Sequence, residues 1–198
     1  MVGYPELETT TVVKVNDNYK TKITLLEHPT DYDWLQVKKR AFVTVGKESN
    51  KVPDGAWMKR ILKAHHSPIR YLRFSFLLEN IPYWVSVHLC RHVHAQPYVK
   101  SQRNDRQSAY DREAARQDEP VNMIWDMNAE ELITICNKRL CSMASNETRK
   151  VVRAIQNLVI LHNPEFAGVL VPMCVREHEC NEFKSCGYWD ILKDLKEN

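Results

Sequence analysis

The pattern of apolar and polar residues predicts β-strands in the first part of the chain. Apolar and polar residues alternate over 11–15 and 21–26, and both stretches are rich in β-branched residues. The turn-forming stretch 16–18, Asn-Asp-Asn, separates them, so the pair predicts a hairpin. Two later stretches, 71–78 and 83–90, predict two more strands joined by a turn, because one face of each would be apolar.

Apolar residues recur every three or four positions in four other stretches, which therefore predict helices. Two of them, 31–45 and 55–64, lie between the hairpin and the later strands. The strongest pattern covers 129–161, either as one helix or as two helices with a break near 145–146. A short amphipathic stretch at 188–195 predicts a last helix near the end of the chain.

The remaining stretches are interpreted from their polarity. Residues 91–103 are polar and predict a loop, whereas residues 104–118 are highly charged and compatible with a helix. Pro120 opens a stretch that predicts a connector up to residue 128. The chain has 198 residues and only 5 glycines, so we expect one compact domain without long flexible linkers.

Composition and charge narrow the class of protein. Apolar residues make up 43% of the chain and charged residues 27%, as in ordinary globular proteins. The net charge of +3 is too small to indicate nucleic-acid binding by itself. The first residues show no signal-peptide pattern, and no apolar stretch is long enough to span a bilayer. We therefore expect a cytoplasmic protein that does not act at a membrane.

In such a protein, the six cysteines are expected to be reduced thiols or metal ligands rather than disulfides. Cys174, Cys180 and Cys186 are evenly spaced in the tail, 172–198, and His178 lies between the first two. Three thiolates and one imidazole are a known zinc-ligand set, although the five-residue gaps are wider than usual. Reduced thiols in a packed tail are the preferred interpretation, so no metal site is assigned and zinc stays an open alternative.

Cationic and hydroxyl side chains are concentrated in the loop 91–103, RHVHAQPYVKSQR. Such groups suit an anionic ligand such as a phosphate, because Arg offers paired donors and hydroxyl and backbone N–H groups complete the shell. Arg139 is a second candidate, since it lies on the apolar face of the predicted helix 129–161. A cation there needs an anionic partner, unless its stem packs on that face while its head reaches water.

Four stretches resemble, in the same order along the chain, motifs of the flavin-dependent thymidylate synthases, the ThyX family. Residues 64–68, AHHSP, are similar to the family's G-H-x-S/T-P, and residues 91–101 are similar to its RHR-x7-S signature. Residues 115–120, ARQDEP, are similar to its A-R-x-x-L-P. Residues 128–149 contain segments similar to its N-A/L-R-x-L, L-R and A-Q-x-E-I-R.

This resemblance implies an α+β fold. It implies a single ThyX-like domain over 1–198, with an antiparallel or mixed sheet flanked by helices and a long C-terminal helical region. It also implies an activity, the FAD-dependent methylation of dUMP to dTMP, with methylenetetrahydrofolate as carbon donor and NADPH as reductant. This chemistry requires no nucleophilic cysteine. Members of the family are homotetramers that share their sites between chains.

The family's site roles transfer only to matching positions. The positions that match flavin contacts are His65, Ser67, Arg91, His92 and Asn128. The positions that match dUMP contacts are His88, Arg91, Ser101, Gln102, Arg103, Arg116 and Arg139. Among them, Ser101, Gln102 and Arg103 match contacts to the phosphate and sugar, and Arg116 assists them. Arg139 is the catalytic candidate, since the matching arginine faces the uracil ring and polarises it at N3. That role would supply the partner that a cation on an apolar face needs.

Several residues depart from the family's motifs, mostly at the flavin end. Val93 stands in place of an arginine, Val99 in place of a glutamate, and Glu130 in place of an arginine. Two alternatives stay open. The first, motivated by His88 in place of a glutamine and by Val93 and Val99, is a related enzyme that modifies C5 of another pyrimidine nucleotide or transfers hydroxymethyl rather than methyl. The second is a non-catalytic module that binds zinc and nucleic acid. The second is disfavoured, because nucleic-acid sites interleave aromatic residues with cations and only Tyr98 and Tyr110 do so here.

Overall fold

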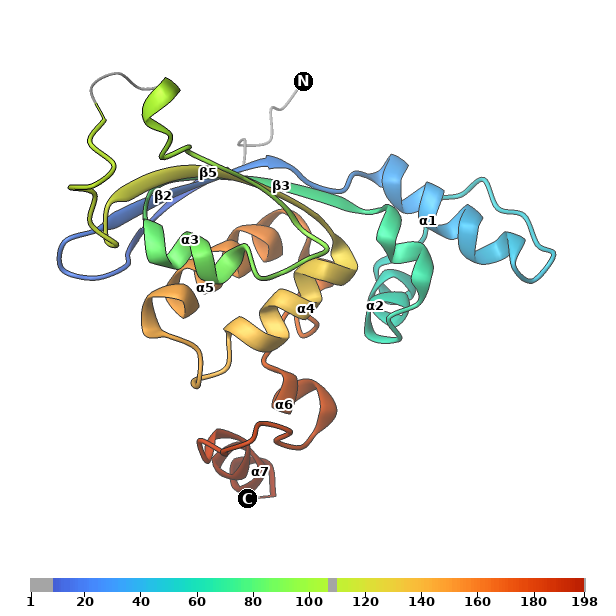
Figure 1. Cartoon of the computed structure of the whole chain (residues 1–198). Helices are drawn as coiled ribbons and strands as arrows, with labels where there is room; N and C mark the ends of the chain where they lie inside the picture. The colour runs from blue at the N-terminus through green and yellow to red at the C-terminus, as the bar shows by residue number, and fades with distance from the viewer. Residues whose placement is uncertain (1–8, 107–109, 198) are drawn as a thin grey trace, which may run out of the picture.

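The computed structural model describes residues 9–106 and 110–197. Within them, one antiparallel five-stranded sheet has the strand order β1-β2-β3-β5-β4. The strands are β1 (Thr10–Lys14), β2 (Lys20–Glu27), β3 (Arg73–Pro82), β4 (Gln96–Val99) and β5 (Pro120–Asn128). The sheet forms one layer of the molecule, and helices cover one of its faces (Figure 1).

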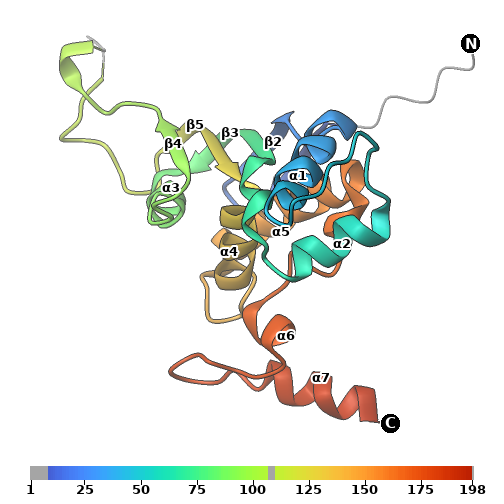
Figure 2. The same ribbon diagram turned by 90° about the vertical axis from the view of Figure 1, so that its right-hand side faces the viewer.

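The helices form three groups around the sheet. They are α1 (Asp31–Val43), α2 (Gly55–Lys63), α3 (Tyr83–Leu89), α4 (Ala129–Arg139), α5 (Asn146–His162), α6 (Met173–Glu177) and α7 (Tyr188–Glu197). Figure 1 shows α3, α4 and α5 beneath the sheet, with α1 and α2 at one end, and Figure 2 shows α6 and α7 below α4. No helix in the described part of the chain has the length and apolar content to cross a membrane. The predicted α+β fold is confirmed.

The apolar face of the sheet forms the core together with these helices. β3 and β5 lie side by side, with Phe76 opposite Trp125, and both side chains are fully buried. Phe166, in the short 3-10 helix η3 (Pro164–Phe166), meets the Phe74 ring edge-on, with ring centroids 5.3 Å apart. Buried rings contribute strongly to the stability of a core, since each removes a large apolar area from water.

Several predicted elements are confirmed. β1 and β2 form the predicted hairpin, and α1, α2 and α7 occupy predicted helical stretches. The stretch 129–161 is two helices, in agreement with the alternative that placed a break near 145–146. The Ser145 side chain accepts a hydrogen bond from the Thr148 N–H and so caps α5, which explains where the second helix begins.

The strand predicted at 83–90 is wrong, because these residues form the helix α3. Val85 and Leu89, four positions apart, are fully buried together with Ser86, whereas Val87 is 42% exposed. Over so short a stretch, alternating and helical spacing fit the same apolar residues. The two kinds of spacing differ in which residues face the core, and only the structure shows which residues do.

The connector predicted at 120–128 is also wrong, because it is the central strand β5. Its alternate side chains are buried in the core: Val121, Met123, Trp125 and Met127. This alternation is the ordinary signal of a half-buried strand, and it was present in the sequence. Pro120 favoured a connector, because proline has no N–H to donate within a sheet, but a proline is tolerated at the first residue of a strand, where Pro120 lies.

Three further predictions need correction. β3 continues through the turn predicted at 79–82. The loop predicted at 91–103 contains the edge strand β4, which pairs with β5. The helix predicted at 104–118 is wrong for its described part, where only Asn104–Arg106 are helical, as the 3-10 turn η2; residues 107–109 lie outside the described residues.

Phe166 provides a test of this core. Phe166→Ala removes a fully buried ring that lies against Phe74 and Trp34, so we expect the free energy of unfolding to fall by about 3–5 kcal/mol. Phe183→Ala is the matched control, because the Phe183 ring is fully exposed and its loss should change the free energy by less than about 0.5 kcal/mol. Urea unfolding of both variants measures the difference, and equal losses would contradict the position of Phe166 in the core.

Candidate functional site

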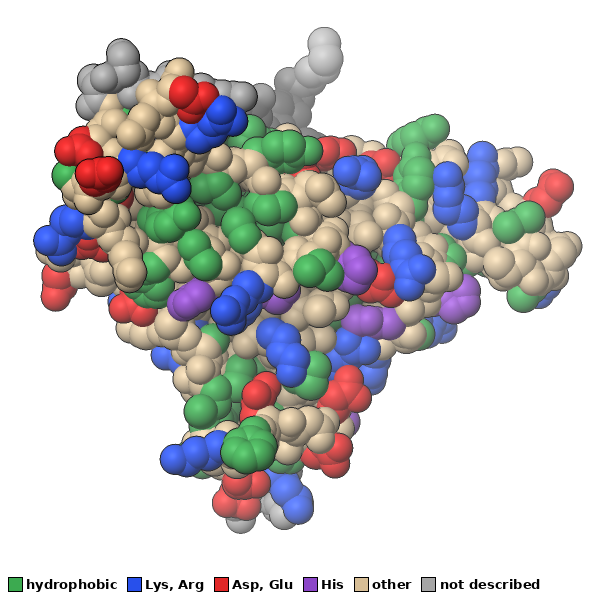
Figure 3. Space-filling view, viewed as in Figure 1, with side chains coloured by type: hydrophobic (Ala, Val, Ile, Leu, Met, Phe, Trp, Pro, Cys, Tyr) green, Lys and Arg blue, Asp and Glu red, His purple; other side chains and the backbone are tan. Residues whose placement is uncertain are grey.

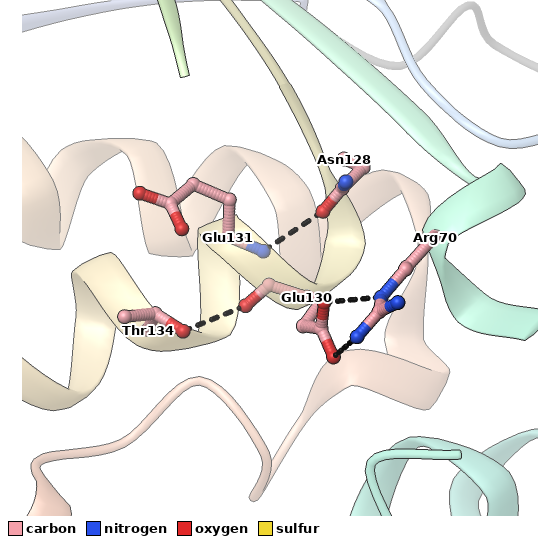
Figure 4. Close-up of polar contacts among 5 residues, drawn as sticks. All are labelled: Arg70, Asn128, Glu130, Glu131 and Thr134. Atoms are coloured by element: carbon pink, nitrogen blue, oxygen red, sulfur yellow. Dashed lines mark hydrogen bonds and ion pairs between the residues drawn. The ribbon is translucent and has the colours of Figure 1, made fainter. Parts of the chain in front are cut away.

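The candidate site is arranged along α4, which follows directly from β5. Asn128, the last residue of β5, caps the helix: its side-chain oxygen accepts a hydrogen bond from the Glu131 N–H at 2.9 Å (Figure 4). Figure 4 shows the Glu130 and Glu131 side chains pointing to different sides of the helix. Acidic residues in a first turn are stabilised by the helix dipole. Here Glu130 contacts Arg70, whereas Glu131 lies near His92.

A chain of polar contacts runs from Glu131 through His92 to Arg139. Glu131 is buried, and its Oε1 lies 3.7 Å from Nδ1 of His92. Nε2 of His92 accepts a hydrogen bond from Nε of Arg139 at 2.9 Å, so the ring is neutral and carries its proton on Nδ1. Arg139 also donates through Nη2 to the His88 carbonyl oxygen at 3.0 Å. These contacts fix the plane and direction of the Arg139 guanidinium.

Burial determines the protonation states along this chain. Burial, with a further contribution from the Arg139 charge, lowers the pKa of His92 to about 4. Burial and then the Arg91 charge lower the pKa of Arg139, although an arginine stays charged at neutral pH. Among the described residues, no carboxylate lies within ion-pair distance of Arg139. A half-buried cation in this state favours an anionic or strongly polar ligand.

His88 connects the site to α5. Its Nδ1 lies 3.1 Å from the hydroxyl oxygen of Thr148, a buried residue near the start of α5. Burial lowers the pKa of His88, and the charges of Arg139 and Arg91 lower it further. Four predicted site residues therefore come together: His88, Arg91, His92 and Arg139. Figure 3 shows histidine, lysine and arginine side chains in a band across the surface over α3 and α4.

Other residues predicted to contact flavin lie near the first turn of α4. Ser67 is exposed at the start of the 3-10 helix η1 (Ser67–Tyr71), which packs against α4. His65 precedes it in a left-handed backbone conformation, with φ at 48°, and its buried Nε2 has no hydrogen-bond partner among the described residues. Burial, followed by the charge of Arg176, lowers the pKa of His65. The predicted flavin contacts are thus divided between the two ends of α4.

Glu130, one of the departures from the family motif, is paired with Arg70 of η1. Nε and Nη2 of Arg70 donate to the two carboxylate oxygens at 2.6 and 3.2 Å (Figure 4). The pair offsets the negative charge that stands where the motif has an arginine. A cation is therefore present beside this position, but residue 70 supplies it.

The residues predicted to hold the dUMP phosphate lie elsewhere, on an arm that comprises residues 100–118 apart from 107–109. They are Ser101, Gln102, Arg103 and Arg116. The arm extends away from α4 in both ribbon views (Figures 1 and 2). Arg103 pairs with Asp105 at 2.9 Å and Arg116 with Asp118 at 2.8 Å, and both arginines are exposed. The structure therefore brings His88, Arg91 and Arg139 together, but it does not bring the predicted phosphate contacts to them within one chain.

Sequence reasoning missed three residues of this site: Glu131, Thr148 and Arg70. Glu131 gave a usable signal, because it is an acidic residue on the helical face that also carries Ile135. Thr148 belongs to a segment with family resemblance but was given no role. Arg70 gave no signal, since its partner is 60 positions away along the chain.

A separate hollow of about 510 Å³ lies between β1 and α5. Its lining includes Thr10–Val13 from β1 and three cations from α5: Arg149, Lys150 and Arg153. None of the residues predicted to bind flavin or dUMP lines it. The hollow and the site along α4 are therefore different places, and the site is defined by its chemistry rather than by this cavity.

Comparisons with known proteins bear on the fold. No family model and no curated protein matches the sequence. Among solved structures, the chain resembles a crystal structure of thymidylate synthase X (ThyX) from Helicobacter pylori with FAD and dUMP. The TM-score is 0.60, the identity is 14%, and the match covers 75% of this chain and 98% of that chain. This likeness shows a ThyX-like fold, and the activity has to be argued from the site.

The buried His92 predicts a loss of stability in acid. Its pKa is about 4 in the folded protein and about 6.5 in the unfolded chain, so the unfolded chain binds more protons between these values. The contribution of His92 to the free energy of unfolding is fully present above the unfolded pKa. It is lost as the pH drops towards 4, and the loss amounts to at most roughly 3 kcal/mol. We expect His92→Gln to lack this part of the acid sensitivity, because glutamine does not titrate but still offers Arg139 an acceptor.

Urea unfolding of both proteins at a series of pH values between about 8 and 4 measures this effect. The difference between the two curves isolates His92, since the other histidines and the carboxylates titrate in both proteins. Parallel curves would show that His92 is not held neutral in the folded protein.

Proposed function

We propose that this protein is a flavin-dependent thymidylate synthase. It methylates dUMP to dTMP, with FAD as cofactor, methylenetetrahydrofolate as carbon donor and NADPH as reductant. The observation that carries the proposal is the half-buried Arg139 guanidinium, held by His92 and His88 and without a carboxylate partner among the described residues. The ThyX-like fold supports it, since the similar crystal structure was determined with FAD and dUMP.

Arg139 acts on the pyrimidine ring of dUMP in this proposal. Its Nε and Nη2 atoms are occupied by His92 and His88, while Nη1 has no partner among the described residues and can donate to a ligand. C5 of uracil becomes a stronger nucleophile when the ring is polarised or ionised at N3, because the negative charge there is delocalised to C5. A cation already fixed in place stabilises that charge without reorganisation during the reaction.

Some, but not all, of the residues predicted to contact the flavin have side chains available for binding it. Arg91 and Ser67 are exposed, and neither side chain has a hydrogen bond to another described residue, so both can donate to phosphate oxygens. Asn128 and His92 are already engaged, as helix cap and as acceptor for Arg139. These two residues therefore hold α4 and the Arg139 side chain in place rather than contact the flavin through those atoms. When bound, a reduced flavin supplies the hydride that completes the methyl group.

The proposal includes a homotetramer in which neighbouring chains complete each site. The arm carries the four predicted phosphate contacts away from its own α4 (Figure 2), and in this proposal it reaches a neighbouring chain. The uncovered face of the sheet also presents apolar side chains: Leu77, Ile124 and Tyr98 are cross-strand neighbours, and Tyr98 is 61% exposed. Exposed apolar groups of this kind favour contact with another protein surface.

The first test is the visible spectrum of the full-length protein after FAD addition and desalting, with and without dUMP. We expect retained flavin bands that shift with dUMP, because both ligands would share one site. No retained flavin in either case would contradict the proposal. Turnover of dUMP and UMP, followed by product mass, separates it from the alternative enzyme that acts on another pyrimidine nucleotide.

Arg139→Met tests the role of the guanidinium, because methionine keeps an apolar stem and removes the donors. We expect dUMP affinity to fall about 10- to 100-fold, as for the loss of a charged hydrogen bond, while flavin binding persists. Arg60→Ala is the control, since Arg60 is exposed on α2 and takes no part in the site. Titrations of the flavin spectrum with dUMP measure both variants. Unchanged affinity in Arg139→Met would remove Arg139 from the pyrimidine contacts.

A further inference from the structure

Four of the six cysteines line one small hollow below α4. Cys141 follows the C-terminal end of α4, Cys174 lies in α6, and Cys180 and Cys186 belong to the tail. Trp189 of α7 closes another side of the hollow.

The other two cysteines have different surroundings. Cys136 is fully buried in the core, where burial raises its pKa to about 12, and Cys90 is exposed at the end of α3. The four cysteines of the hollow, which we call the cysteine cluster, come from separate segments that only the folded chain brings together. Four thiols around one hollow are the ligand set of a structural metal site, in which the protein supplies every ligand.

The tail has little core of its own. α6 contains no buried residue, and several large apolar side chains beyond it are exposed. These are Phe183, Tyr188, Ile191 and Leu195. The ion pair that joins the tail to α4, Lys138–Glu182, is 3.4 Å long and partly exposed, and such pairs contribute little. Small segments with so little apolar burial are commonly held by disulfides or by a metal ion.

We propose that the cysteine cluster binds one Zn²⁺ ion, which fastens the tail to the end of α4. The hollow has a volume of about 10 Å³, roughly one water-sized sphere, which suits a single ion and not an iron–sulfur cluster. No group of three or more His, Cys, Asp or Glu side chains in the described residues is already arranged to hold a metal. The thiols therefore close on the ion by side-chain rotation, and each loses its proton on binding.

Cys141 replaces His178 in the ligand set that the sequence left open. The His178 ring lies against Trp189, with ring centroids 5.6 Å apart, and His178 does not line the hollow. Cys141 does line it, and it lies two positions after Arg139. An ion bound there would hold both the tail and the end of the helix that carries the candidate site.

The test uses the full-length reduced protein, stripped of metal with a chelator and reconstituted with Zn²⁺. We expect one tightly bound ion per chain after gel filtration, and Co²⁺ in its place should give the visible spectrum of a tetrahedral four-thiolate site. Substitution of any cluster cysteine by serine should weaken metal binding at least about 10-fold. Cys90→Ser and His178→Ala are the matched controls, and both should bind as the unsubstituted protein does.

Two outcomes would overturn the proposal. One is an unsubstituted protein that retains no zinc or gives a cobalt spectrum without four thiolates, which decides the question even where a serine variant fails to fold. The other is a His178→Ala variant that loses the ion while Cys141→Ser retains it. Neither readout involves flavin or dUMP, so the result is independent of the proposed function.

Discussion

The contact between the half-buried Arg139 guanidinium and His92 is the interaction on which the site depends. Arg139 donates to His92 Nε2 and to the His88 carbonyl, and without these acceptors it would be a cation half removed from water with nothing to bind. His92 can accept only while it is neutral, and burial keeps it neutral by lowering its pKa to about 4. Burial raises the free-energy cost of the Arg139 charge, and it also keeps His92 in the neutral form that accepts the Arg139 hydrogen bond.

α4 transmits this arrangement to the rest of the fold. Its first N–H, that of Ala129, donates to the Leu72 carbonyl at 2.9 Å, and Asn128 caps it from the end of β5. A helix of 11 residues is about 16 Å long, so the Asn128 and Arg139 ends can contact different parts of a large ligand. Sheet, cap and helix thus fix where the guanidinium lies relative to η1 and Arg70. The strand register is therefore part of the site.

The sequence correctly predicted those elements whose pattern of apolar and polar residues fits only one type of secondary structure. The hairpin, α1 and α2 followed from turn residues and helical spacing, while the stretch that contains α4 and α5 was predicted to be helical with one or two helices left open. It failed for α3, where seven residues satisfy two periods at once, and for β5, where the clear alternation was set aside for its opening proline. The motif resemblance singled out His88, His92 and Arg139, which the structure brings together, but not Glu131 or Arg70, since the partners of a side chain are set by tertiary contacts.

The proposed function requires the arm to bind a phosphate although it lies away from α4 of its own chain, and the ion pairs on the arm are compatible with that role. Arg103 and Arg116 are exposed, and each is paired with an aspartate two positions away. Exposed pairs of this kind are weak, because water screens both charges. A phosphate, with more negative charge than one carboxylate, can displace the aspartates at little cost and gain paired hydrogen bonds. In the proposed function, these local pairs would keep both arginines neutralised until another chain brings a nucleotide within their reach.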